Sequence, residues 1–203
     1  MTNKGFTLIE MLVSIAIFTI VMTMALGALL ALSVADRKAE TLKSGIDNLT
    51  FALDSMSRAV RTGSNYDCGN QASTAPTDCP NGANYLTFLA ACPSGTVCAG
   101  GGLQTYYQLD VAQDGTSQCG QTILPFGCIE RSFTGIAGSW IPITSPDLII
   151  QNTGFLFHVK GAPSGDSIQP KVTITASSTV PVTPTQRTGV FMQTTVTQRI
   201  YDQ

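Results

Sequence analysis

Apolar positions in the first third of the chain follow two different patterns, one after the other. No charged residue occurs from Met11 to Ala35, a run of twenty-five positions. As a helix, a run of this length would be about 37 Å long, more than the roughly 30 Å hydrocarbon core of a membrane. Further along, apolar residues recur at three- and four-residue steps, which indicates a helix with one packed face. They are Ile46, Leu49, Leu53, Met56 and Val60.

Together, the two patterns predict a single long helix. The first proline is Pro76, so no helix breaker interrupts residues 6–62. We therefore expect one helix from Phe6 to about Thr62, with Gly63 as its C-terminal cap. Its first half would cross a membrane, and its second half would lie against a sheet through the apolar stripe.

Beyond residue 62 the pattern changes to that of strands. Residues 63–84 are rich in Gly, Asn, Ser and Pro and are predicted as a loop. Later segments have strand character. They are Tyr85–Ala91, Gln104–Val111, Cys128–Phe133, Leu148–Val159, Lys171–Ser177 and Val190–Tyr201. The expected fold class is α+β, a long N-terminal helix packed on a mainly antiparallel β-sheet domain.

The composition narrows the range of functions. The chain has 203 residues, of which 43% are hydrophobic and only 12% are charged, and its net charge is −2. Residues 63–203 contain five basic and eight acidic residues, a net charge of −3. A nucleic-acid binder needs clustered basic residues that displace counterions from phosphates, so we expect no nucleic-acid partner.

Motifs for catalysis, cofactors or metals are missing from the sequence. The single histidine, His158, cannot form a histidine-based metal site, and Gly100–Gly102 is not followed by the Lys-Ser/Thr of a phosphate-binding loop. Asp110 and Asp114 lack the spacing of a calcium loop, and Asp114-Gly115 predicts a hairpin turn instead. We therefore expect a protein that is not an enzyme and that has no cofactor and no metal.

Six cysteines and the lack of a Cys-x-x-Cys motif favour an oxidising compartment. Six cysteines allow fifteen pairings, of which pairing between neighbours along the chain is the simplest. Those pairs are Cys68–Cys79, Cys92–Cys98 and Cys119–Cys128. Zinc binding is the alternative, but the intervals between these cysteines are longer than those of zinc sites.

Glu10 stands just before the uncharged run. A carboxylate there costs up to about 2.5–3.5 kcal/mol at the centre of a membrane helix, and less near its end. Lys4 and the chain's own amine are the only basic groups within reach. A secretory signal peptide or a simple signal anchor would not explain Glu10, and the apolar run exceeds the about 7–15 residues of a signal peptide.

The segment Lys4-Gly5-Phe6-Thr7-Leu8-Ile9-Glu10, followed by the apolar run Met11–Val34, resembles the class III leader of type IV prepilins and type II secretion pseudopilins. The resemblance implies cleavage after Gly5 by a prepilin peptidase and N-methylation of the new terminus, Phe6. It also implies that Glu10 pairs with the Phe6 amine of a neighbouring subunit during assembly.

The same resemblance divides the chain into four parts. Residues 1–5 are the leader, and residues 6–35 are the transmembrane and filament-core half of the helix. Residues 36–62 are its amphipathic half, and residues 63–203 form the extracytoplasmic β-rich domain. This arrangement implies a single-pass protein of the inner membrane that joins a filament of other pilin or pseudopilin subunits.

Two short stretches point to a particular kind of subunit. Residues 49–61 and Gln193–Arg199 resemble J-type minor pseudopilins and W-type minor pilins, and no cysteine follows residue 128, where many major pilins have a disulfide loop. The sequence therefore predicts a structural minor subunit that assembles into a filament or primes its assembly. The alternatives are a binding module at a pilus tip, such as an adhesin or an uptake receptor, and a membrane-anchored enzyme.

Overall fold

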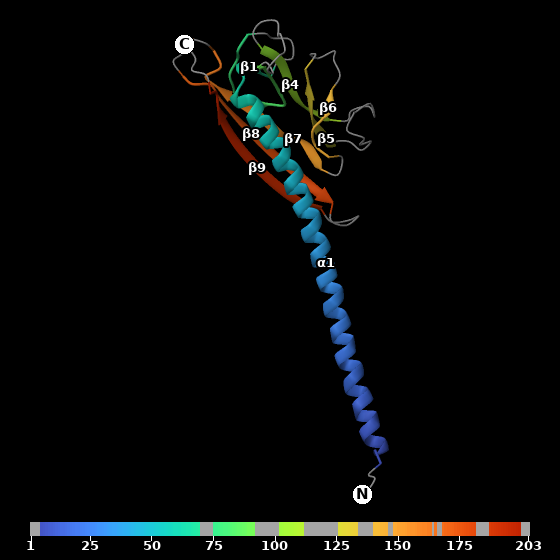
Figure 1. Cartoon of the computed structure of the whole chain (residues 1–203). Helices are drawn as coiled ribbons and strands as arrows, with labels where there is room; N and C mark the ends of the chain where they lie inside the picture. Colours follow the sequence, from blue (N-terminus) through green and yellow to red (C-terminus); the bar gives the residue numbers. More distant parts are fainter. Residues whose placement is uncertain are drawn as a thin grey trace. The chain divides into compact units, whose positions relative to one another are not determined.

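The computed structural model has one long helix followed by strands, and this order confirms the α+β class (Figure 1). It describes residues 5–69, 75–91, 102–111, 126–133, 140–145, 148–163, 165, 168–181 and 187–199. The chain divides into two compact units, Met1–Thr41 and Leu42–Gln203. In the first unit, residues 5–40 are all exposed.

The helix α1 spans Leu8–Arg61, close to the predicted bounds. In the second unit, one face of α1 is buried through Gly45, Leu49, Ala52, Leu53, Met56 and Val60. The expected stripe also included Ile46, but this side chain is 38% exposed. Gly45 takes its place because helix and sheet come so close there that a Cβ would collide with the Val180 side chain.

Gly63 has a different role from the one predicted. Its amide donates to the Val60 carbonyl at 3.0 Å, but it is not among the residues with positive φ, so it is not a left-handed cap. A Cβ on Gly63 would meet the ring of Phe88. The glycine is therefore needed because the chain passes close to the core at this point.

The strands of the second unit form one antiparallel sheet. They are β1 (Ser64–Cys68), β2 (Cys79–Ala83), β3 (Tyr85–Ala91), β4 (Gly102–Val111), β5 (Phe126–Ser132), β6 (Ile141–Pro142), β7 (Ile149–Lys160), β8 (Lys171–Pro181) and β9 (Arg187–Thr197). Along the sheet the order is β1-β3-β4-β5-β7-β8-β9, while β2 pairs with β7 and β6 with β5. β1 and β9 are therefore the edge strands at the two ends of this order.

The loop expected over residues 63–84 is partly wrong, because β1 and β2 lie within it. Both are strands of five residues that depend on distant partners: β1 pairs with β3, and β2 pairs with β7. Their sequences contain Asn, Pro and Gly, which locally favour turns. Pairing across the fold therefore overrides the local preference.

One hydrophobic core lies in the second unit, where residues from α1 meet inward-facing side chains of the sheet. Tyr66, Phe88 and Tyr107 form a row of rings with centroids 5.9 Å apart at each step. The Tyr66 hydroxyl shares its proton between the carbonyl oxygens of Val60 at 2.7 Å and Gly63 at 2.8 Å. These contacts fix the end of α1, whose last carbonyls have no partner within the helix.

Candidate functional site

The first candidate site is the beginning of α1, where Thr7 caps the helix. The Thr7 hydroxyl accepts from the Glu10 amide at 3.4 Å, and it lies 3.4 Å from Glu10 Oε2, to which it donates. A threonine followed three residues later by a glutamate is the pattern of a capping box. Both distances are at the upper limit for a hydrogen bond, so this local contact leaves the Glu10 carboxylate open to a stronger partner.

Three hydroxyl groups further along this half of α1 are satisfied within the helix. Ser14 donates to the Glu10 carbonyl at 2.7 Å, Thr19 to Ala16 at 2.9 Å, and Thr23 to Ile20 at 2.8 Å. A hydroxyl that is bonded to its own backbone does not need a partner in lipid. Glu10 is therefore the group in this apolar segment that most needs a partner from outside the helix.

Gly5 and Phe6 precede the helix and are exposed. The Phe6 side chain is 80% exposed, and no atom outside the adjacent chain lies within 4 Å of a Cβ built on Gly5. Their peptide bond is therefore accessible in an extended, non-helical segment. Residues 1–4, including Lys4 of the predicted leader, lie outside the described residues.

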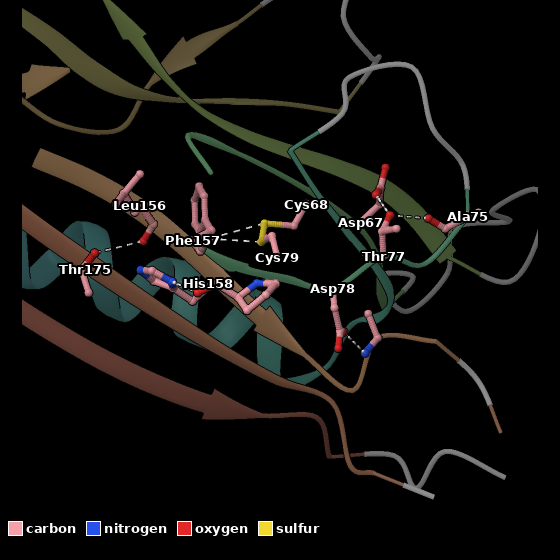
Figure 2. The surroundings of a disulfide bond; sticks show 12 residues. Asp67, Cys68, Ala75, Thr77, Asp78, Cys79, Leu156, Phe157, His158 and Thr175 are labelled. Atoms are coloured by element: carbon pink, nitrogen blue, oxygen red, sulfur yellow. Dashed lines mark hydrogen bonds between the residues drawn. A yellow bond between two sulfur atoms is a disulfide. The ribbon is translucent and has the colours of Figure 1, made fainter. Parts of the chain in front are cut away.

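The second candidate site surrounds a disulfide between Cys68 and Cys79, which matches the expected pairing (Figure 2). Both sulfur atoms contact the carbonyl oxygen of Phe157, at 3.4 and 3.3 Å. The disulfide joins β1 to β2 and holds both against β7. Cys128 is also disulfide-bonded. Cys92, Cys98 and Cys119 lie outside the described residues, so the pairings Cys92–Cys98 and Cys119–Cys128 stay predictions.

Asp78, next to this disulfide, was not singled out by the sequence. Its carboxylate accepts from the backbone amides of Gly161 at 3.1 Å and Ala162 at 2.7 Å, at the turn after β7 (Figure 2). His158 Nδ1 lies 3.1 Å from the Pro80 carbonyl, which fits a proton on Nδ1. These contacts tie the β2 segment to β7, so the region around the disulfide is a structural clamp.

Among the described residues, no group of three His, Cys, Asp or Glu side chains could hold a metal ion. His158 is half-buried on β7. The side chain of Asp110 and the whole of Asp114 lie outside the described residues, so the hairpin turn at Asp114-Gly115 stays a prediction.

Comparison with known protein families gives a match for the N-terminal segment. A family model described as the prokaryotic N-terminal methylation motif matches residues 1–26. No curated protein and no solved structure matches the chain at a significant level. The motif supports a type IV pilin-like prepilin leader, and α1 contains a segment long and apolar enough to cross a membrane. Such a leader implies processing by a prepilin peptidase and assembly with other pilin subunits, and it favours a structural role.

Proposed function

We propose that the chain is a minor subunit of a type IV pilus or a type II secretion pseudopilus. In this proposal, a prepilin peptidase cleaves after Gly5, and the new terminal residue, Phe6, is N-methylated. The observation that carries the proposal is the methylation motif over residues 1–26, in which Glu10 stands directly before the exposed, uncharged part of α1. The accessible peptide bond between Gly5 and Phe6 supports cleavage at this point.

Glu10 is proposed to pair with the Phe6 amine of a neighbouring subunit. Both charges lose water when they enter the membrane, so the pair contributes little net stability compared with two apolar groups. Removing one partner is different, because it leaves the other charge buried and alone, at a cost of about 3–5 kcal/mol. The pair therefore selects the correct docking position, in which both charges are satisfied.

In this proposal, the chain has the four parts that the sequence predicts. Residues 1–5 are the leader, residues 6–35 cross the inner membrane and later pack in the filament core, and residues 36–62 lie in the amphipathic half of the helix. The domain formed by residues 63–203 lies outside the cytoplasm. The disulfide between Cys68 and Cys79 supports this orientation, because disulfides persist in oxidising compartments.

A place among the minor subunits is supported by the resemblance of residues 49–61 and Gln193–Arg199 to J-type and W-type subunits. In the structure, residues 49–61 supply most of the buried face of α1, and residues 193–197 belong to β9 at one end of the sheet. A minor subunit of this kind would act at the filament tip, where it primes assembly.

Two measurements on the full chain test this function. The mature protein should have the mass of a chain that begins at Phe6 and carries one additional methyl group. Glu10→Gln keeps the shape of the side chain but removes its charge, so we expect cleavage to continue and incorporation into filaments to fail. Glu40→Gln is the matched control, because Glu40 is also an exposed glutamate of α1, and it should assemble normally.

The proposal would be overturned by a mature chain that retains Met1–Gly5. It would also be overturned if Glu10→Gln entered filaments as well as the wild-type protein does.

A further inference from the structure

The two ends of the sheet differ in how open they are to another strand. β1 is only five residues long, and its register against β3 shifts between Ser64 and Asp67. Asn65 has a φ of 54°, and Cys68 is held in the disulfide. Short length and an irregular register are features by which proteins prevent an edge strand from pairing further. β1 is therefore a protected edge.

β9 lacks these protections. It is eleven residues long and pairs with β8 from Arg187 to Thr197 without any shift in register. Between Arg187 and Arg199 it contains no proline and no charged side chain. Within the described part of the chain, no strand pairs with its outer side. A long, regular and uncharged edge exposes backbone N–H and C=O groups that favour pairing with another strand.

Side chains on both faces of β9 would gain cover from such a strand. On the face away from the helix, Phe191 is 67% exposed. On the helix side, Met192 is half-buried, and its sulfur lies 3.8 Å from the Thr50 hydroxyl. Ile46, one helical turn before Thr50, is 38% exposed. An added strand with apolar side chains would therefore bury surface on both faces.

The direction of α1 shows why a second copy of this chain is disfavoured as the partner. Thr50 contacts Met192, and the Arg61 carbonyl accepts from the Arg199 amide at 2.9 Å. Residues 50–61 of the helix therefore run in the same direction as β9 (Figure 1). Two copies paired antiparallel through β9 would carry residues 50–61 of α1 in opposite directions, whereas the proposed function anchors both chains in one membrane.

We propose that the outer edge of β9 binds an extended strand from a different polypeptide, by backbone hydrogen bonding. The uncharged stretch between Arg187 and Arg199 favours a partner strand without charges in its middle, and the exposed Arg199 favours an acidic residue at one end of that strand. The choice of a different polypeptide over a second copy rests on the proposed membrane-anchored function. The open edge itself does not depend on it.

A designed peptide tests this edge with the full chain in detergent micelles. The probe is an eleven-residue peptide of alternating Thr and Val with Asp at each end, matched in length to β9. Its control has the same sequence but is N-methylated at every residue, which removes the backbone amide donors from both edges of the peptide. In fluorescence anisotropy, we expect the control to bind at least about tenfold more weakly, because strand addition depends on those amides.

Two lysine variants test whether the peptide probe binds at β9. Gln193→Lys puts a charge on the open edge, and we expect binding of the probe to weaken by about tenfold. Ser177→Lys is the matched control, since Ser177 is also exposed but lies on β8 inside the sheet. Binding by the wild-type chain and by Ser177→Lys, and not by Gln193→Lys, is the expected result.

Three results would overturn the inference. The probe could fail to bind the wild-type chain, or the N-methylated control could bind equally well. Light scattering could instead show a dimer of this chain that Gln193→Lys abolishes, and the partner would then be a second copy. The proposed function is tested separately, by the mass of the mature chain and by the assembly of Glu10→Gln. Peptide binding requires neither processing nor a filament, so the two proposals can fail independently.

Discussion

The two parts of α1 have the same secondary structure but opposite surroundings. Residues 8–40 are exposed along their whole length, although most of their side chains are apolar, whereas Leu49, Met56 and Val60 are completely buried within the second unit. Apolar side chains that find no cover within their own chain must find it in lipid or in other subunits. The second part of the helix is therefore stabilised by the folded sheet domain, whereas the first part leaves its apolar surface available to lipid or to other subunits.

The largest difference between the two parts should appear when a leucine is shortened in each. Leu49→Ala removes a completely buried side chain, so the free energy of unfolding of the sheet domain should fall by about 2–5 kcal/mol. Leu30→Ala removes a side chain that is 70% exposed, and unfolding should not change. Denaturant titration of the full chain in detergent, followed by near-UV circular dichroism, measures both. Equal effects of the two variants would contradict this division of the helix.

The sequence predicts the helix well because both of its patterns are local. The uncharged run and the apolar stripe need no knowledge of the rest of the chain, although Ile46 is more exposed than predicted and Gly63 is not a left-handed cap. Glu10 and Phe6 were predicted in the same way, through a motif in consecutive residues, and their roles stay predictions. The pairing Cys68–Cys79 followed from proximity along the chain.

Features that depend on distant contacts were missed. β2 contains Pro80 and Gly82, which locally favour a turn, and it becomes a strand only through β7 and the disulfide. In the sequence Asp78 cannot be distinguished from other aspartates in loops, because its partner, the Gly161 amide, is distant along the chain. The open edge of β9 also depends on the order of strands in the sheet. The alternation of apolar and polar residues predicts a strand but does not predict its neighbours.

A smaller difference in the free energy of unfolding should distinguish alanine substitutions at two glycines of α1. A Cβ at Gly45 would collide with Val180, so Gly45→Ala should lower the free energy of unfolding of the sheet domain by about 1–3 kcal/mol. Gly27 has no atom within 4 Å of its Cβ position. Gly27→Ala should therefore leave the domain unchanged, or stabilise the helix by up to about 1 kcal/mol. The same denaturant titration compares the two variants, and a stabilising Gly45→Ala would show that helix and sheet do not touch there.

The smallest effect concerns the end of the helix. Tyr66→Phe removes the hydroxyl that bonds the Val60 and Gly63 carbonyls, and near neutral pH it should cost about 0.5–1.5 kcal/mol of unfolding free energy. Leu30→Ala again serves as the reference, because it alters α1 outside the folded core.

This cost should depend on pH in a defined direction. Burial raises the pKa of Tyr66 above its usual value near 10, so the folded state keeps the proton longer than the unfolded state does. The stabilising contribution of the hydroxyl is complete below the unfolded pKa and is lost as pH rises from there towards the folded pKa. The difference between wild type and Tyr66→Phe should therefore be constant up to about pH 9 and should shrink by about 1 kcal/mol by about pH 11. Other buried tyrosines, such as Tyr107, are present in both proteins and cancel in the comparison. A difference that grows with pH would mean that Tyr66 does not hold its proton in the core.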